Sequence, residues 1–439
     1  MAGLNKYQAY PEYRDSGMEW LGEIPRTWQT YTGKRLFSSV RTPALSNDEQ
    51  LAASQKYGVI PQTLMMQLND SKVMLALKGT DSFRHVEKNN FVISLRSFEG
   101  GIEHSNYQGC VSPAYTVLKS VNDISFSFYR YLLKSEPYIS ALQASTDSLR
   151  DGKSINYEQF GAITLPSPSL PEQSIIAHFL DHETAKIDNL IEKQQQLIEL
   201  LKEKRQAVIS HAVTKGLNPD VPMKDSGVEW LGEIPNNWIT IKLKFITTLR
   251  SEKIVLPHTR YVGLENISSG DGSFIVTTDI TPESTSLLFE KDDILFGKLR
   301  PYLAKAWLAT FSGVCSSEFL VLKVEKLNPK YLNYFILSQT FIKQVDSSTY
   351  GTKMPRANWE DIGQLPIPLC SYEESKKIAM YLDKLTANLD ILKEQQLHQI
   401  ELLKERRTAL ISAAVTGKID LRNWTAPIPE AETPTEVSA

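Results

Sequence analysis

The amino-acid sequence predicts an α+β protein built from two similar halves, each a mixed α/β domain followed by a long helix. Two repeated motifs support this prediction. The segment DSGMEWLGEIPRTW at 15–28 returns as DSGVEWLGEIPNNW at 225–238, with 11 of 14 positions identical and an offset of 210. The segment at 198–214 returns at 400–416, with 13 of 17 positions identical and an offset of 202. Because an internal repeat determines the whole architecture, we expect a pseudo-two-fold molecule.

The order of the repeated motifs divides the chain into five segments. The last of them is rich in Pro, Glu and Thr after Asn423, a composition typical of disorder. The expected segments are a first domain (1–169), a central helix (170–216), a second domain (217–369), a C-terminal helix (370–417) and a disordered tail (418–439).

Both helices are predicted from their hydrophobic period and their end signals. Each follows a proline-rich or turn-like stretch and ends at a glycine, Gly216 or Gly417. Steps of three and four residues predict two coiled-coil seams. The apolar seam positions are Ile187, Leu190, Leu197, Leu201 and Val208 in the first helix, and Leu389, Leu392, Leu403 and Leu410 in the second.

The polar side chains within these seams, such as Gln194 and Gln396, favour one specific pairing, because buried polar positions fix register and orientation. The first helix must carry the chain from the first domain to the second, and the second helix can return beside it. We therefore expect an antiparallel coiled coil. The motif at Asp15 should then lie near the end of the second helix.

The two domains themselves read as alternating short strands and helices. A helical stretch is expected at 329–338. The β-like runs are 90–95, 115–118, 260–264, 293–296 and 319–324.

Composition limits the class of protein. With 439 residues, of which 41% are hydrophobic, the chain can form more than one core. No signal-peptide pattern or membrane-length apolar run is present, and the three cysteines indicate reduced thiols, so we expect a cytoplasmic protein. The net charge of −3 argues against nucleic-acid binding, unless basic side chains gather on one face or a partner supplies the phosphate contacts.

Four phrases accompany the alternation of domains and helices: YVGLENI (261–267), GKLRPY (297–302), GTKMPR (351–356) and LPEQ (170–173). In this alternation and these phrases the sequence resembles, over nearly its whole length, the specificity subunits of Type I restriction-modification systems. The second helix departs from the family with YEES at 372–375, and we expect this to alter only the helix start. The resemblance implies two target-recognition domains. Each reads one half of a bipartite, asymmetric DNA site, and the helices set the spacer.

Base reading in the major groove calls for Arg, Lys, Asn or Gln side chains on loops. The two glycine-flanked clusters of the second domain are the strongest candidates, because glycine lets a backbone approach phosphate closely. For any one surface Arg or Lys, a solvated charge is the more common role. The DNA-binding candidates are Arg96, Arg150 and Lys153 in the first domain, and Lys298, Arg300, Lys353 and Arg356 in the second.

The resemblance also implies the partners and cofactors. It implies a non-catalytic chain that holds neither cofactor nor metal. Its partners would be double-stranded DNA, two modification subunits that use S-adenosylmethionine, and two motor-nuclease subunits that use ATP and Mg²⁺. Exposed helix faces and the Trp20 and Trp230 motifs are the expected docking surface for the modification subunits.

Two alternatives remain open from the sequence. An independent nuclease or methyltransferase would need convergent acidic groups such as Glu290, Asp292 and Asp293, which also read as a charged turn. A scaffold that binds only proteins would use the leucine seams and the two tryptophans. Asp151-Gly-Lys-Ser154 resembles a phosphate loop but lacks its first glycine, and His178 with His182 lacks a third metal ligand in the nearby sequence.

Overall fold

The computed structural model describes residues 6–69, 82–145, 155–254, 260–277, 286–351 and 353–427. The chain divides into two compact units, one formed by residues 1–193 with 398–439 and the other by residues 194–397. Each unit therefore contains one globular head and part of each long helix. We call the globular parts head one and head two.

The two heads share a four-stranded antiparallel sheet with the same strand order. The sheet of head one runs β4 (Phe37–Val40), β11 (Thr116–Ser120), β8 (Phe91–Ile93) and β9 (Glu103–His104). The sheet of head two runs β16 (Thr247–Arg250), β23 (Phe319–Val324), β20 (Ile294–Gly297) and β21 (Ala306–Leu308). The strand runs predicted at 90–95, 115–118, 293–296 and 319–324 coincide with β8, β11, β20 and β23.

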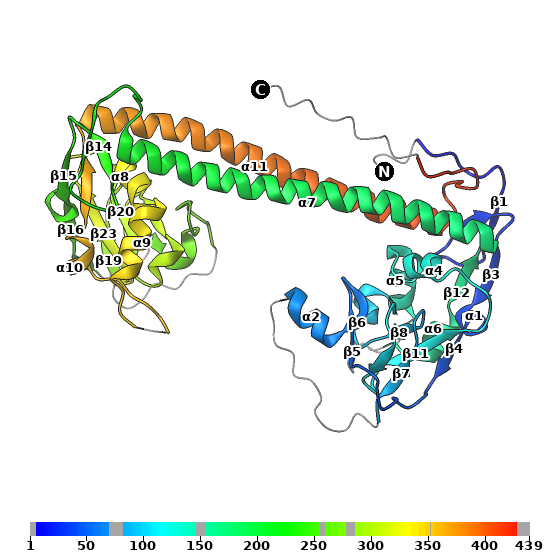
Figure 1. Ribbon diagram of the computed structural model, residues 1–439. Helices are drawn as coiled ribbons and strands as arrows, with labels where there is room; N and C mark the ends of the chain where they lie inside the picture. The colour runs from blue at the N-terminus through cyan, green and yellow to red at the C-terminus, as the bar shows by residue number, and fades with distance from the viewer. Residues whose placement is uncertain are drawn as a thin grey trace. The chain divides into compact units, whose positions relative to one another are not determined.

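Smaller elements surround each sheet (Figure 1). Those of head one are β1 (Tyr13–Asp15), β2 (Glu23–Pro25), β3 (Gln29–Thr32), α1 (Gly33–Leu36), β5 (Leu51–Ser54), β6 (Gly58–Pro61), α2 (Gln62–Asn69), β7 (Arg84–Val86), α3 (Ser97–Gly100), β10 (Gly109–Val111), α4 (Phe126–Leu132), α5 (Glu136–Ala144), α6 (Tyr157–Ala162) and β12 (Thr164–Ser167). Those of head two are β13 (Met223–Asp225), β14 (Glu233–Pro235), β15 (Ile239–Lys242), η2 (Leu243–Phe245), β17 (Lys253–Ile254), β18 (Tyr261–Val262), η3 (Leu264–Asn266), β19 (Ser286–Phe289), η4 (Pro301–Leu303), β22 (Gly313–Cys315), α8 (Pro329–Ile336), α9 (Gln339–Ser347), α10 (Trp359–Ile362) and β24 (Pro366–Leu369).

Alternating side chains of each sheet enter two separate cores, because successive strand residues face opposite sides. In head two, Ile294 and Phe296 pack with α8 and α9 residues such as Phe335. Leu295, on the opposite face, packs with Trp307 and with residues of the other sheet of this head, β17-β19-β22-β18. Head one repeats this pattern in its own two clusters. Both heads thus have helices on one face of the four-stranded sheet and further strands on the other. Those strands form a second four-stranded sheet, β17-β19-β22-β18, in head two and the two-stranded sheets β5-β6 and β10-β7 in head one.

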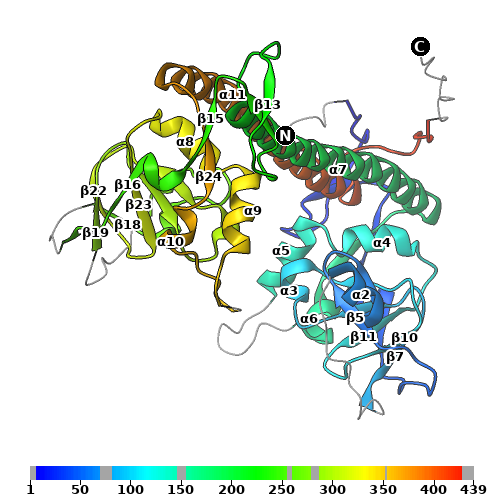
Figure 2. The same ribbon diagram turned by 60° about the vertical axis from the view of Figure 1, so that its left-hand side comes forward.

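The long helices are α7 (Leu170–Lys215) and α11 (Tyr372–Val415). They lie side by side in both views (Figure 1 and Figure 2). Arg205, late in α7, bonds to Asp390, early in α11, and Arg407, late in α11, bonds to Asp188, early in α7. The predicted antiparallel pairing is therefore confirmed. No helix in the described ranges is long and apolar enough to cross a membrane.

The seam positions need a correction in both helices. Leu190, Leu197 and Leu392 are exposed (46%, 40% and 43%), whereas Ile198 and Ile400 are buried. The other predicted positions, Ile187, Leu201, Val208, Leu389, Leu403 and Leu410, are buried or half-buried. The inward stripes follow steps of four and then three residues, whereas the prediction used three and then four. Because both helices carry apolar residues on neighbouring positions, the hydrophobic period alone did not decide between these two stripes.

The predicted disordered tail also needs a correction. Ile419 and Leu421 are buried in the core of head one, and the Trp424 ring packs on Phe179 with 5.5 Å between ring centroids. Apolar side chains hold this stretch of the tail against the head. The remainder, 428–439, lies outside the described residues.

The motif at Asp15 lies at the end of α11, as predicted. The Lys418 ammonium donates to the Glu23 carbonyl (2.9 Å), and Gly417 lies against Pro25 and Trp28. In head two, Gly216 at the end of α7 lies against Trp238 of the second motif. The two ends of the repeat are thus closed in the same way.

The family departure at 372–375 has a different effect from the one expected. Both helices begin at equivalent residues, Leu170 and Tyr372. Gln173 accepts the Ser125 amide (2.8 Å), and Ser375 accepts the equivalent Asn328 amide (3.0 Å). The substitution therefore changes how the helix holds its head and leaves the helix start in place.

Candidate nucleic-acid interface

The two candidate loops of head two lie together at the end of β20. The Arg300 amide donates to the Pro355 carbonyl (2.8 Å), and the Ala357 amide donates to the Lys298 carbonyl (3.0 Å). Arg356 and Tyr350 exchange two backbone hydrogen bonds of 3.0 and 3.1 Å. Lys298, Arg300, Lys353 and Arg356, which are 58 residues apart at most, are thus held on one small backbone framework, which we call the head-two basic loops.

Two backbone features shape these loops. Arg300 adopts a left-handed conformation, with φ of 49°, which an L-residue rarely occupies. Gly351 has φ of 91° and supplies a turn. Gly297 has a different role from the predicted phosphate approach, because it is buried in β20, where a Cβ would come within 3.0 Å of the Leu264 side chain. A side chain at 297 would therefore press on Leu264 in the core.

The four cationic side chains are not equally available. Arg300, Lys353 and Arg356 are exposed, and Lys298 is half-buried. The Arg356 guanidinium donates to Glu318 (2.9 Å), which neutralises part of its charge. Arg356 therefore anchors the loop in this structure, whereas Arg300 and Lys353 extend toward solvent.

Head one presents Arg96 in the corresponding turn. Leu95 and Arg96 follow β8 and precede the short helix α3, as Leu299 and Arg300 follow β20 and precede η4. Arg96 is exposed, like Arg300. The other two candidates of head one, Arg150 and Lys153, lie outside the described residues.

Three further side chains at these sheet ends, Arg41, Arg84 and Tyr350, were not selected by the sequence analysis. Arg41 follows β4, and the Arg84 guanidinium donates to the Tyr115 carbonyl (2.5 Å) just before β11. Burial and the neighbouring charge of Arg41 lower the pKa of Arg84. In head two, Tyr350 is an exposed aromatic beside Arg356. No motif marks these residues, because strand pairing alone brings them to the edge.

The acidic cluster that the enzyme alternative requires is a structural ion pair. The Arg250 guanidinium contacts both Glu290 and Asp293, with 2.7 Å between Arg250 Nε and Asp293 Oδ2. Asp293 also accepts the Glu290 amide (2.8 Å). Burial raises the pKa of Asp293, although Arg250 and the Glu290 amide oppose that shift. Glu290 and Asp293 thus form a charged turn with Arg250, and Asp292 lies in the same turn in a left-handed conformation, with φ of 70°.

Other candidate sites are also accounted for. Trp20 packs edge-on against Tyr138 of its head, and Trp230 packs on Phe335 of the other. His182 lies beside Trp424, with 5.8 Å between ring centroids. Across the described ranges, no group of three or more His, Cys, Asp or Glu side chains is placed to hold a metal ion.

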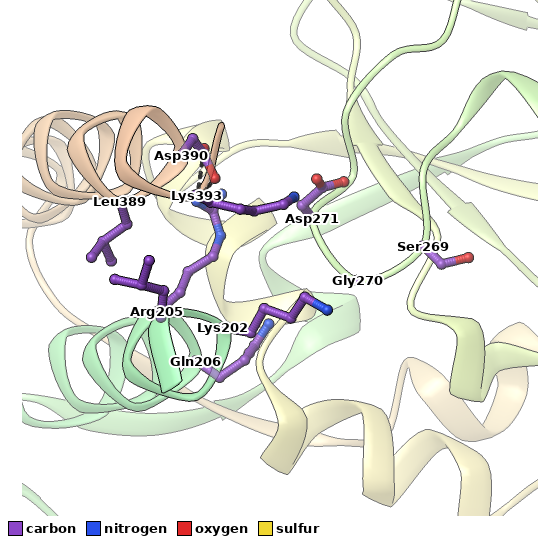
Figure 3. Close-up of a pocket in the computed structure, with 10 residues that line it drawn as sticks. Lys202, Arg205, Gln206, Ser269, Gly270, Asp271, Leu389, Asp390 and Lys393 are labelled. Atoms are coloured by element: carbon purple, nitrogen blue, oxygen red, sulfur yellow. Dashed lines mark hydrogen bonds and ion pairs between the residues drawn. The ribbon is translucent and has the colours of Figure 1, made fainter. Parts of the chain in front are cut away.

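A pocket of about 190 Å³ lies between the two helices and the loop 269–271 of head two (Figure 3). Lys202, Arg205 and Lys393 line it together with Asp271 and Asp390. Its mixed charges include the Arg205–Asp390 ion pair. The pocket therefore belongs to the contact that joins the helices to this head.

Comparison with known proteins agrees with this architecture. Residues 25–200 and 235–402 match the family described as Type I restriction modification DNA specificity domain. The chain is 25% identical over 440 residues to the Type I restriction enzyme MjaVIII specificity subunit of Methanocaldococcus jannaschii, covering 95% of this chain and 98% of that protein.

Two solved structures share the fold. One chain, from work on complex assembly and conformational transition of the type I R-M system, aligns with a TM-score of 0.64 and 13% identity, covering 90% of this chain and 99% of that one. The HsdS subunit from Thermoanaerobacter tengcongensis aligns with a TM-score of 0.52 and 14% identity, covering 90% and 98%.

Proposed function

The chain belongs to the family of Type I restriction-modification DNA specificity subunits, and on that premise we propose that each head reads one half of a bipartite, asymmetric DNA site. Specificity subunits are a non-catalytic component of a Type I complex that binds DNA. The observation that carries the proposal is that Arg96 and Arg300 lie in the corresponding turn of each head, between the same strand of the sheet and a short helix. Each follows the same strand of its sheet and is exposed.

The differences between the heads account for the asymmetry. Arg96 follows Ser94-Leu95, whereas Arg300 follows Lys298-Leu299 and lies against a second loop that carries Lys353. Arginine at a base edge favours guanine through two hydrogen bonds, and its neighbours decide which base pairs lie on either side. Two frames with different side chains therefore read two different half-sites.

We further propose that the paired helices set the unread spacer. α7 is one helix of 46 residues, which corresponds to about 69 Å at 1.5 Å per residue. A coiled coil of that length is a stiffer connection than a loop. Half-site spacing then follows from helix length and register.

The modification subunits would dock on the exposed leucines of the helices. Leu190 and Leu392 are exposed at equivalent positions of the repeat, and so are Leu200 and Leu402. Apolar side chains exposed at repeated positions fit two copies of one partner. The partners would be two modification subunits that use S-adenosylmethionine, joined in the restriction form by two motor-nuclease subunits that use ATP and Mg²⁺.

Methylation mapping tests the proposal. The chain is expressed with a modification subunit in a host that lacks Type I methylation, and modified adenines are located by single-molecule sequencing. A two-part asymmetric motif that depends on this chain is expected. Methylation that is unchanged without the chain would contradict the proposal.

Leu200→Glu with Leu402→Glu tests the docking surface and should abolish co-purification with the modification subunit. Gln195→Glu, at another exposed helix position, should not.

A further inference from the structure

Two ion pairs join α7 to α11 at equivalent positions of the repeat. Arg205 Nη1 lies 2.9 and 2.8 Å from the two carboxylate oxygens of Asp390 (Figure 3). Arg407 Nε lies 2.9 Å from Oδ1 of Asp188. The repeat offset of 202 converts Arg205 into Arg407 and Asp188 into Asp390. Each helix therefore supplies one arginine and one aspartate.

We propose that these two pairs are positioning residues that select the register of α7 against α11, and so the spacing of the two heads. Asp188 and Arg205 are 17 residues apart on α7, and Asp390 and Arg407 are 17 apart on α11. Because the intervals are equal, one antiparallel register satisfies both pairs together. The link to DNA spacing rests on the proposed function, whereas the link to helix register does not.

At the helix ends, apolar residues such as Val213 of α7 and Ile378 of α11 share the core of head two, but between the ends the apolar seam selects register only weakly. The inward stripes include Gln194, Lys393 and Gln396 among their members. The Arg205 side chain is 16% exposed and also donates to the Thr386 carbonyl (3.3 Å). Exposed ion pairs contribute little by themselves, but a largely buried arginine is costly to leave without its partner. Between the two heads, register errors are therefore penalised mainly through Arg205.

A slip of one heptad keeps the same helix faces together, so it is the main competitor. In one direction the slip places Leu397 opposite Arg205 and Gln195 opposite Arg407, and both arginines lose their carboxylates. In the other direction it places Asp383 opposite Arg205 and Asp181 opposite Arg407. This second register would offer new carboxylates and needs a separate barrier.

Contacts from the heads provide that barrier. The Tyr334 hydroxyl donates to Asp383 (2.9 Å), and Lys330 pairs with the same carboxylate (2.7 Å). In head one, Tyr131 donates to Asp181 (2.7 Å), and Arg130 pairs with it (2.5 Å). Both carboxylates that a slipped helix would use are already occupied. The native register is therefore the one in which all four aspartates have partners.

A distance between spin labels on the two helices tests the register directly. Labels are attached to cysteines introduced at the exposed positions Glu203 and Lys377 of the full chain, since the native cysteines are buried. Arg205→Asp with Arg407→Asp places carboxylates against Asp390 and Asp188. The expected result is a slip toward Leu397, which lengthens the label distance by about 10 Å, the rise of seven helical residues.

Adding Asp188→Arg and Asp390→Arg to those two changes should restore the original distance. Lys204→Asp with Arg406→Asp is the matched control, because it alters the same charge at the neighbouring equivalent positions and should leave the distance unchanged. An unchanged distance in the first variant, with only a lower unfolding midpoint, would overturn the proposal. If that variant does not fold, Arg205→Gln with Arg407→Gln should give two label distances, and a single native distance there would overturn it.

Methylation mapping provides the functional readout. The variant with Arg205→Asp and Arg407→Asp should methylate sites whose spacer differs from that of the wild-type chain. Adding Asp188→Arg and Asp390→Arg should restore the original spacer. A spacer unaffected by a measured helix slip would overturn the link to DNA spacing alone. If the wild-type chain directs no two-part motif, the proposed function fails, while the label distances still decide the register.

Discussion

Replacing Arg300 with glycine separates the fold of the head-two basic loops from their binding to DNA. Arg300 has φ of 49° and ψ of 62°, and its side chain is exposed. A left-handed conformation costs an L-residue roughly 1–2 kcal/mol, which glycine does not incur. Glycine also loses more entropy on folding, by roughly 0.5–1 kcal/mol. Arg300→Gly should therefore leave the stability of head two unchanged or raise it by about 1 kcal/mol.

The same substitution should impair recognition. Loss of an arginine that contacts a base costs roughly 1–3 kcal/mol, which corresponds to about a 5- to 150-fold loss of affinity. The chain and its modification subunit are titrated with DNA duplexes that carry single changes in either half-site. Binding should weaken at one half-site only, and discrimination there should relax at one base pair.

Ala304→Gly is the matched control, because Ala304 shares the left-handed conformation, with φ of 49°, but is buried. Its affinity for DNA should equal that of the wild-type chain. Thermal unfolding of both variants reports the backbone effect. Unchanged binding by Arg300→Gly would refute the assignment of Arg300 as a DNA contact, and a large loss of stability would refute the strain argument.

Three further changes test other parts of the account. Arg96→Ala should weaken binding about tenfold at the half-site that Arg300→Gly leaves intact; an effect on the same half-site would contradict the equivalence of the heads. Burial lowers the pKa of His104 to about 4, so the unfolded chain binds the proton first as pH falls from about 6.5. Urea unfolding of head one should lose about 2 kcal/mol between pH 7 and pH 5, and the loss should vanish in His104→Gln. Oε1 of buried Glu172 accepts both the Tyr10 hydroxyl (2.7 Å) and the Trp28 indole (3.0 Å). Glu172→Leu removes this acceptor and should cost about 1–3 kcal/mol in thermal unfolding; the equivalent Glu374→Leu should cost less.

The repeat made the architecture predictable, because two copies of one motif specify both the helices and their closure. The antiparallel pairing followed from chain connectivity alone. The seam did not follow, since Leu190 and Ile191 are neighbouring apolar residues and either could face the partner helix. The structure turns Leu190 outward and Ile198 inward. Exposed leucines at repeated positions fit an additional subunit that the single sequence does not contain.

The DNA-binding candidates of head two stay a prediction, but the sequence already placed them in two short phrases. Lys298 and Arg300 lie in one phrase, and Arg356 lies in another that resembles the family. Arg41 and Arg84 could not be found in this way, because strand pairing brings them near Tyr115. The ion pair between Arg356 and Glu318 could not be predicted from the sequence either, because 38 residues separate the partners.

Exchange of one head tests most directly whether the two heads read independently. Residues 29–169 are replaced by the corresponding segment of another specificity subunit, and the chimera is expressed with the same modification subunit. Single-molecule sequencing then compares its methylated motif with that of the wild-type chain. We predict that one half-site changes while the other half-site and the spacer remain the same. A motif in which both halves change, or neither does, would contradict independent reading by the two heads.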